Sequence, residues 1–167
     1  MLRSYSRFLR VWRRFRTEGN GGSGQPGEID LTAYIGTWVS PSHVNPAVEF
    51  TISEFLESEE TMIGTKIHHF KGSVKCTVLA GGEIAITQKW DPTAMGGDSI
   101  KVQQYGKEAF LFVDAGNDAD EGGTVKLSHG QWDGNNLRFN VEIREKDNPI
   151  AVYETAGGAY TDVFSKK

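Results

Sequence analysis

The feature that most constrains the fold is an alternation of apolar and polar residues from about residue 31 onward. It is clearest in residues 137–145, LRFNVEIRE, and in residues 82–90, GEIAITQKW. In the first run the apolar positions are Leu137, Phe139, Val141 and Ile143. A period of two with one apolar side is typical of half-buried strands that pair antiparallel around one core. The pattern therefore predicts an all-β domain.

Turn residues divide this region into short runs. The clearest separators are Lys71-Gly72, Gly81-Gly82, Asp133-Gly134-Asn135 and Gly157-Gly158. The candidate strands are 34–40, 47–55, 61–71, 73–80, 83–90, 99–105, 109–114, 123–128, 136–144, 150–154 and 160–164. Residues 52–60, ISEFLESEE, also fit a short helix. Short strands at regular spacing with tight turns favour a sandwich or an up-and-down barrel.

The domain opens with residues 34–38, YIGTW. A Gly-x-Trp on the first strand resembles the start of the calycin families, which include lipocalins, fatty-acid-binding proteins, avidins and nitrobindin-like haem barrels. Residues 86–90, ITQKW, are similar to a strand of the nitrobindin-like barrels. The resemblance covers the architecture of residues 31–165. It implies an antiparallel up-and-down barrel of roughly eight to ten strands, closed at one end by Trp38, with Gly36 allowing a close backbone approach.

A calycin-like shape also implies an internal cavity for a small apolar ligand. Four aromatic residues could line such a pocket, although aromatic side chains in a small β protein more often belong to the core. They are Trp90, Tyr105, Phe110 and Trp132. The last histidine is His129, so the proximal histidine of the nitrobindin-like barrels is not found. The biotin-binding pattern of avidins is not recognisable either, and we expect no cofactor.

The first sixteen residues, MLRSYSRFLRVWRRFR, hold six of the chain's eight arginines and no acidic residue. On a helical wheel the apolar side chains fall within an arc of roughly 180°, and the arginines occupy the opposite arc. The apolar residues are Leu2, Tyr5, Phe8, Leu9, Val11, Trp12 and Phe15, and the opposing arginines are Arg3, Arg7, Arg10, Arg13 and Arg14. We expect residues 1–16, the N-terminal arm, to form an amphipathic targeting or docking helix. Because so short a helix is marginal in water, it should form against a surface.

Several surfaces fit the arm. A mitochondrial import receptor and an anionic inner membrane recognise amphipathic, arginine-rich, acid-free segments, which predicts a transit peptide and mitochondrial localisation. A membrane interface, a groove on a partner protein, or RNA would also accept this pattern. As a last alternative, the arm could pack against the chain's own domain. No run of about 18 apolar residues predicts a membrane-spanning helix.

The two parts of the chain carry opposite charge. The arm is +6, whereas the residues from 17 onward include twelve basic and twenty-two acidic side chains, a net charge of −10. Phosphate would repel such a domain, so we do not expect the barrel to bind nucleic acid. Residues 17–30 begin TEGNGGSGQPGE, the composition of a flexible tether or of an engineered fusion scar. The expected organisation is thus an arm (1–16), a Gly-rich linker (17–30) and a β-barrel domain (31–167).

Candidate chemistry is sparse. Residues 114–123, DAGNDADEGG, place Asp114, Asp118 and Asp120 close together, which makes a calcium site an alternative to a solvated acidic hairpin tip. His68 and His69 are consecutive on a strand and should face opposite sides, with one of them inward and satisfied by a neighbour. Cys76 is the only cysteine, expected to be buried, so no intrachain disulfide forms.

No catalytic motif is present, and no catalytic residue is predicted. The sequence favours a non-enzymatic accessory or scaffold subunit, docked in or targeted to a mitochondrial or membrane-associated complex by its arm. The alternative is a calycin-type carrier or sensor of a small apolar ligand. An enzyme built in the barrel cavity is a third hypothesis, for which the sequence names no residues.

Overall fold

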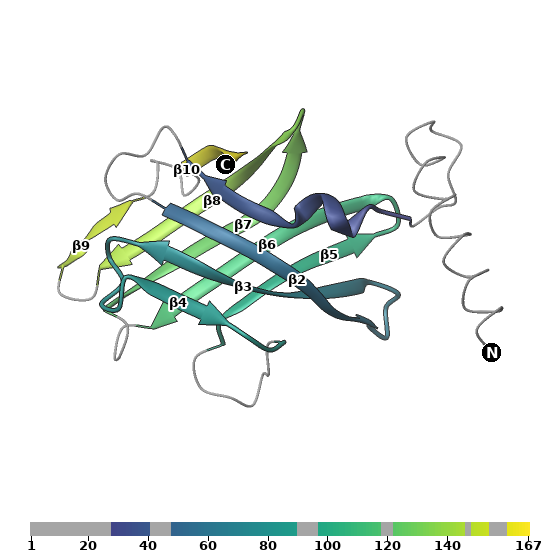
Figure 1. Ribbon diagram of the computed structural model, residues 1–167, viewed down its shortest axis with the longest axis horizontal. Coiled ribbons are helices and arrows are strands. Elements are labelled where there is room, and N and C mark those ends of the chain that lie inside the picture. The colour runs from purple at the N-terminus through teal and green to yellow at the C-terminus, as the bar shows by residue number, and fades with distance from the viewer. Residues whose placement is uncertain (1–27, 41–47, 90–96, 118–121, 146–147, 154–159) are drawn as a thin grey trace.

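The computed structural model describes residues 28–40, 48–89, 97–117, 122–145, 148–153 and 160–167 (Figure 1). This part of the chain forms one short 3-10 helix and ten strands. They are η1 (Leu31–Tyr34), β1 (Gly36–Val39), β2 (Val48–Glu60), β3 (Lys66–Cys76), β4 (Glu83–Ile86), β5 (Ser99–Tyr105), β6 (Glu108–Asn117), β7 (Gly123–Asp133), β8 (Asn136–Glu145), β9 (Asn148–Tyr153) and β10 (Tyr160–Lys166). The arm and residues 17–27 of the linker lie outside the described residues.

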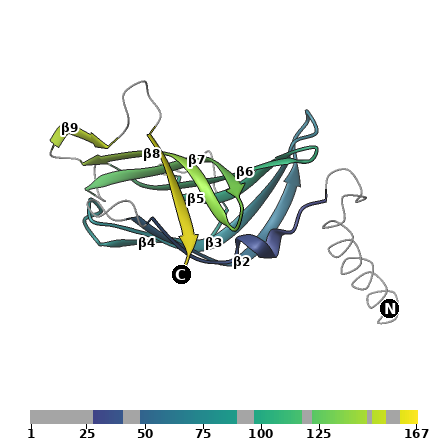
Figure 2. The same ribbon diagram turned by 90° about the horizontal axis from the view of Figure 1, so that it is seen from above.

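Eight of these strands close into an antiparallel barrel (Figures 1 and 2). The order around it is β1, β2, β3, β5, β6, β7, β8 and β10. Closure depends on β10, which pairs with β8 on one side and with β1 on the other. The two remaining strands lie off this path, because β4 pairs with β3 and β9 pairs with β8. The all-β, antiparallel barrel expected from the sequence is confirmed at this level.

The alternating apolar residues fill the barrel. On β8, Leu137, Phe139 and Ile143 are fully buried, as the alternation predicted. The rings of Phe50, Phe139 and Phe164 contact one another near the centre, with centroids 5.3–5.6 Å apart. All three side chains are 0% exposed. The middle of the barrel is therefore a packed core, as is usual for eight-stranded barrels of this size.

The main corrections concern β2 and β3. Residues 52–60 continue β2 and do not form a helix. The two strands expected at 61–71 and 73–80 are one strand, β3, and the turn predicted at Lys71-Gly72 is wrong. Gly72 pairs with Ile52 inside the sheet, where a Cβ atom would clash with the carbonyl oxygen of Thr51. This glycine thus marks a close approach between strands and not a chain reversal.

Other boundaries differ less. Tyr34 belongs to η1 and not to the first strand, and β4 ends at Ile86 instead of continuing to residue 90. In contrast, β7 continues past Ser128 as far as Asp133. The strand predicted at 99–105 matches β5, and the one predicted at 136–144 is one residue shorter than β8.

Candidate functional site

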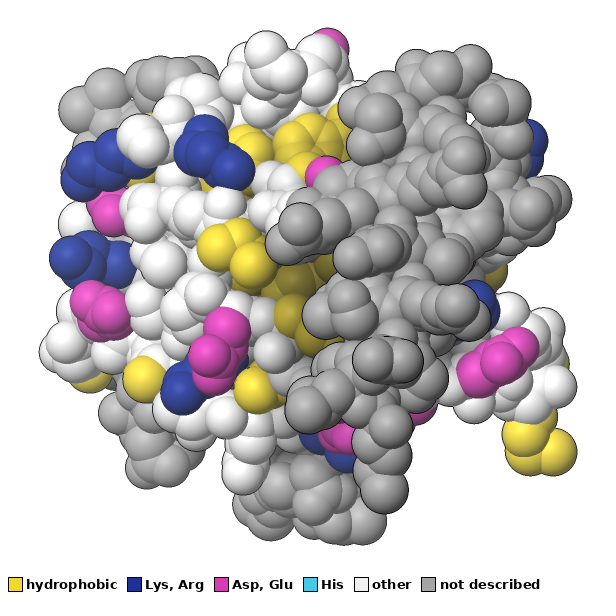
Figure 3. Space-filling model, turned by 45° about the vertical axis from the view of Figure 1, so that its right-hand side comes forward, with side chains coloured by type: hydrophobic (Ala, Val, Ile, Leu, Met, Phe, Trp, Pro, Cys, Tyr) yellow, Lys and Arg dark blue, Asp and Glu magenta, His cyan; other side chains and the backbone are white. Residues whose placement is uncertain are grey.

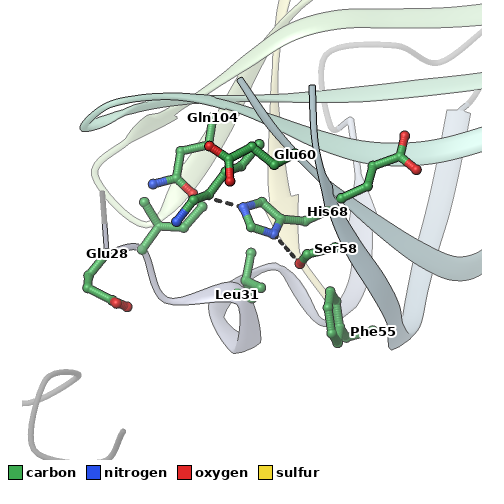
Figure 4. Close-up of a pocket in the computed structure, with 10 residues that line it drawn as sticks. Glu28, Leu31, Phe55, Ser58, Glu60, His68 and Gln104 are labelled. Carbon is green, nitrogen blue, oxygen red and sulfur yellow. Dashed lines mark hydrogen bonds between the residues drawn. The ribbon is translucent and has the colours of Figure 1, made fainter. Parts of the chain in front are cut away.

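One end of the barrel carries η1 and holds a cavity of about 410 Å³, the mouth cavity (Figures 3 and 4). It lies between the segment that leads into η1, the far end of the β2–β3 hairpin and the end of β5. Its lining residues are Glu28, Ile29, Leu31, Phe55, Ser58, Glu59, Glu60, Lys66, His68 and Gln104. Its volume is within the range of sites that bind small molecules.

Trp38 lies inside the barrel and is hydrogen-bonded to η1. Trp38 is 1% exposed, and its Nε1 donates a hydrogen bond to the carbonyl oxygen of Tyr34 at 2.9 Å. The Lys166 ammonium, from β10, lies 5.1 Å from the centroid of the Trp38 ring and donates to the carbonyl oxygen of Ala33 at 3.3 Å. Gly36 has φ +142°, and a Cβ there would lie 2.9 Å from Cε of Lys166. Residues of η1, β1 and β10 therefore contact one another at this point.

Three polar side chains form a connected hydrogen-bond network in the mouth cavity (Figure 4). His68 on β3 is 6% exposed and lies between Ser58 on β2 and Gln104 on β5. The Ser58 Oγ lies 2.6 Å from Nδ1 of His68, and the Gln104 Oε1 lies 2.8 Å from Nε2. Both ring nitrogens of the buried imidazole are therefore satisfied.

The network fixes the tautomer of His68. The amide nitrogen of Gln104 donates to the carbonyl oxygen of Gly106 at 3.0 Å, so the amide oxygen faces the imidazole. Nε2 of His68 must then carry the proton and donate it to Gln104. This leaves Nδ1 to accept the hydroxyl proton of Ser58. Burial lowers the pKa of His68 more than the Gln104 hydrogen bond raises it, which keeps the ring neutral at neutral pH.

The wall beside this network is apolar. Ile29 and Leu31 pack against the core from the entry segment and η1. Phe55 is 42% exposed, and its ring lies 5.8 Å from that of buried Phe70. The cavity thus combines a fixed polar network with a partly open apolar surface, the usual composition of a ligand site.

The rim is acidic. Among the described lining residues, Glu28, Glu59 and Glu60 carry carboxylates and Lys66 carries an ammonium group. Glu59 forms an ion pair with Lys89 at 3.2 Å, which is the main reason that the pKa of the Glu59 carboxyl is lowered. For Glu28 and Glu60 the described residues provide no ion-pair partner. Among the described residues, the three carboxylates of the rim thus face two ammonium groups, those of Lys66 and Lys89.

The aromatic residues proposed from the sequence as a pocket lie elsewhere. Trp132 is 42% exposed and contacts the rings of Tyr34 and Trp38, at centroid distances of 5.0 and 5.8 Å. Tyr105 and Phe110 face each other across the β5–β6 hairpin at 6.1 Å. None of these three lines the mouth cavity, and Trp90 lies outside the described residues.

Only one of the three carboxylates of the calcium hypothesis lies among the described residues. Asp114 lies on β6, and burial raises the pKa of its carboxyl despite the nearby charges of Lys101 and Lys126. Asp118 and Asp120 lie outside the described residues. Within the described ranges no group of three or more histidine, cysteine or acidic side chains could hold a metal ion.

His69 is buried next to His68 but belongs to a different set of contacts. Its Nε2 lies 3.4 Å from Oε1 of Glu59, within ion-pair distance, but neither ring nitrogen forms a hydrogen bond with any described residue. The two histidines thus have separate partners, as expected for consecutive strand residues. The expectation that one would be satisfied by a neighbour is confirmed for His68.

A second cavity of about 520 Å³ lies at the opposite end of β2. Its lining residues include Val39, Val48, Cys76 and Thr77. Two of its lining residues, Ser40 and Val48, flank residues 41–47 in sequence, which lie outside the described residues. Burial raises the pKa of the Cys76 thiol, which disfavours a reactive thiolate. The mouth cavity is therefore the better candidate site.

Comparison with known proteins gives no match to a family model, to a curated protein or to a solved structure. Among the helices of the described ranges, none has the length and hydropathy needed to cross a membrane.

Sequence reasoning did not identify Ser58 or Gln104. The only signal was the adjacent histidine pair, since an inward histidine on a strand needs hydrogen-bond partners.

Proposed function

We propose that the protein is a calycin-like binding protein that holds a small molecule in the mouth cavity. One observation carries the proposal: the Ser58–His68–Gln104 hydrogen-bond network is in place without a ligand, and it lies beside an apolar wall. Such a site loses little conformational entropy on binding.

The mouth is a better ligand site than the barrel centre. The centre is occupied by the mutually contacting rings of Phe50, Phe139 and Phe164. A ligand there would have to displace packed core side chains, which costs several kcal/mol. The proposed ligand instead enters between η1 and the β2–β3 hairpin.

The network favours a particular ligand chemistry. Because Ser58 donates its hydroxyl proton to His68, its oxygen is left to accept a hydrogen bond. Ile29, Leu31 and Phe55 favour an apolar body. We therefore propose a neutral, largely apolar molecule with one N–H or O–H donor, since the acidic rim would repel an anion.

The test uses N-phenylnaphthylamine, a neutral apolar fluorophore with a single N–H donor. Ser58→Leu places an apolar side chain in the cavity and removes the acceptor. We expect it to weaken probe binding by at least about tenfold, equivalent to about 1.4 kcal/mol. The matched control is Ser53→Leu on the same strand, outside the cavity, which should retain the wild-type affinity. Equal affinity of both variants, or no binding by the wild type, would refute the site.

A second candidate function rests on the charge separation between the arm and the rest of the chain, +6 against −10. We propose that the arm forms an amphipathic helix that delivers or docks the barrel to a mitochondrial or membrane-associated complex, in which the protein is a non-enzymatic accessory subunit. Replacement of Arg3, Arg7, Arg10 and Arg14 by glutamate should leave a fluorescent fusion in the cytosol. Continued mitochondrial delivery would exclude the targeting role.

A further inference from the structure

The Ser58–His68–Gln104 network has the geometry of a hydroxyl nucleophile with its base. The Ser58 Oγ lies 2.6 Å from Nδ1 of His68, and the Gln104 Oε1 lies 2.8 Å from Nε2, the other nitrogen of the ring (Figure 4). A nucleophile within hydrogen-bond reach of a base, which a third group orients, is the arrangement that activates serine and cysteine side chains in acyl transfer. The third member of such triads is a neutral amide in one recurrent variant, so Gln104 fits this position.

The protonation state of His68 suits a general base. Its Nε2 donates to Gln104, so Nδ1 carries no proton and its lone pair faces the hydroxyl of Ser58. Burial is the main cause of the lowered pKa of His68, and the positive charge of Lys66 adds to this effect. The imidazole is therefore neutral at neutral pH and able to accept a proton.

The hydroxyl of this network is open to the cavity and to water. Ser58 is an exposed residue of β2, and the apolar wall of Ile29, Leu31 and Phe55 lines the same cavity. Lys66 also lines the cavity, and its charge acts on the imidazole. An ammonium group in such a site stabilises the negative charge that develops on a carbonyl oxygen under attack. The cavity thus offers a nucleophile, a base, a cation and an apolar binding surface.

We propose that the mouth cavity is a serine esterase site that hydrolyses neutral esters with an apolar acyl chain. Ser58 is the nucleophile, His68 is the general base, and Gln104 is a positioning residue that acts through His68. This activity rests on the proposed function in one respect, that the mouth cavity admits a small neutral molecule. The oxygen lone pair of Ser58 that accepts a hydrogen bond from a bound donor here attacks a carbonyl carbon.

The reaction has two steps and needs only water as co-reactant. In the first step, the Ser58 Oγ bonds to the carbonyl carbon while its proton moves to Nδ1 of His68. The bond from that carbon to the alcohol oxygen breaks, and His68 gives the proton to the departing alcohol. In the second step, water bonds to the acyl carbon and gives a proton to His68, which returns it to the departing Ser58 oxygen. The sum converts ester and water to carboxylic acid and alcohol.

Covalent labelling of the full wild-type chain tests the nucleophile. In a neutral alkyl fluorophosphonate, an activated serine oxygen displaces fluoride from phosphorus as its proton passes to the base. We expect peptide mass spectrometry to locate the adduct on Ser58, formed at least about a hundredfold faster than on Ser53. Ser53 is an internal control, because it is exposed on the same strand and its hydroxyl donates to the carbonyl oxygen of Lys71. Equal labelling of both serines, or of neither, overturns the proposal.

Turnover of p-nitrophenyl butyrate tests the base together with the nucleophile. Ser58→Ala and His68→Gln should each lower kcat at least about a hundredfold, whereas Ser53→Ala should keep the wild-type rate. Ser58→Cys retains a nucleophile beside His68 and should react with iodoacetamide, whereas native Cys76 is 2% exposed and should not. A wild-type rate in Ser58→Ala would place the reaction elsewhere and contradict the assignment.

The pH profile distinguishes Gln104 from a residue with a purely structural role. The reaction requires neutral His68, so kcat/KM should fall as the pH drops through the folded-state pKa of His68, below about 6.5. In Gln104→Glu a carboxylate faces Nε2, which raises this pKa and moves the acid limb of the profile to higher pH. Glu28, Glu60 and Lys66 line the cavity and are the same in both proteins. An acid limb that stays in place contradicts the role of Gln104.

The ligand site and the esterase fail separately. If both hold, N-phenylnaphthylamine protects Ser58 from the fluorophosphonate. Probe binding without labelling of Ser58 would overturn the esterase and leave the ligand site in place. Labelling of Ser58 by a chain that does not bind the probe would support the esterase and overturn the proposed donor-bearing ligand.

Discussion

Trp38 connects parts of the chain that are distant in sequence. Its indole N–H satisfies the carbonyl of Tyr34, and the Lys166 ammonium lies over its ring. A cation over an indole contributes about 0.5–2 kcal/mol, depending on how far water is excluded. The hydrogen bond matters because a buried carbonyl left without a donor costs roughly 1–3 kcal/mol. The residue thus joins η1, β1 and β10.

His68 should make stability depend on pH. Because burial lowers its pKa in the folded state, the unfolded chain takes up a proton first as the pH falls below about 6.5. The free energy of unfolding is therefore unaffected by this group above that pH. It decreases below it, by up to about 1.4 kcal/mol per pH unit, until the pH reaches the folded-state pKa.

The measurement is urea unfolding at about pH 7.5 and about pH 5 for the wild type and two variants. His68→Gln should show a smaller loss of stability at acid pH than the wild type. His129→Asn, at an exposed position with φ +54° that asparagine tolerates, is the matched substitution of a histidine outside the network. An unchanged acid loss in His68→Gln would contradict the assignment.

The alternation predicted that His68 and His69 have opposite orientations, but not which one faces Ser58. That choice depends on the register of β2 against β3, which shifts between Ile52 and Glu54 and again between Phe55 and Glu57. Each irregularity changes which β2 residues share a face with a given β3 residue. Because the shifts depend on packing across the barrel, the local sequence does not reveal them.

At the scale of elements, β10 determines whether the sheet is closed. It pairs with β8 through Tyr160–Phe164 and with β1 through Ser165 and Lys166, so both of its edges contribute backbone hydrogen bonds. In contrast, β4 pairs with β3 and is not part of the closed path. Loss of β10 would therefore open the barrel, whereas loss of β4 would leave the closed ring of strands intact.

Proline substitution should reveal this difference. Val163→Pro removes the N–H that donates to Oδ1 of Asp162 at 2.9 Å and places a proline ring inside β10, and we expect a loss of about 3 kcal/mol or more or complete unfolding. Ala85→Pro, at an exposed position of β4, should cost less than half as much. Thermal unfolding followed by circular dichroism provides the comparison. Similar losses in both variants would show that closure by β10 contributes little.

Sequence patterns predicted elements well where one face is apolar and turns flank the strand, as for β5 and β8. They failed where glycine has a packing role. Gly72 resembles a turn residue, but the contact that requires it is the carbonyl oxygen of Thr51 on the neighbouring strand. A role that depends on another strand cannot be recognised from the residues on either side.

At the scale of the whole molecule, closure joins residues that are far apart in sequence. Trp38 pairs with Lys166, and β8 pairs with β10 across the β9 segment. Forming such contacts costs loop-closure entropy before any burial compensates for it. The described domain is therefore expected to fold slowly for its size.

Stopped-flow refolding followed by tryptophan fluorescence tests this expectation. We expect the main phase within about 1 ms to a few seconds, the range typical of proteins dominated by non-local strand pairing. Double-jump experiments control for slower phases from proline isomerisation. A main phase complete within microseconds would contradict the closed topology.

The position of β10 also matters during synthesis. A ribosome makes β10 after the other seven barrel strands, so the barrel cannot close until β10 has been synthesised. Until then β1 and β8 have open edges, and the site that Phe164 occupies between Phe50 and Phe139 is empty. Until β10 joins it, the unfinished sheet exposes two open edges, the kind of surface through which chains pair and aggregate.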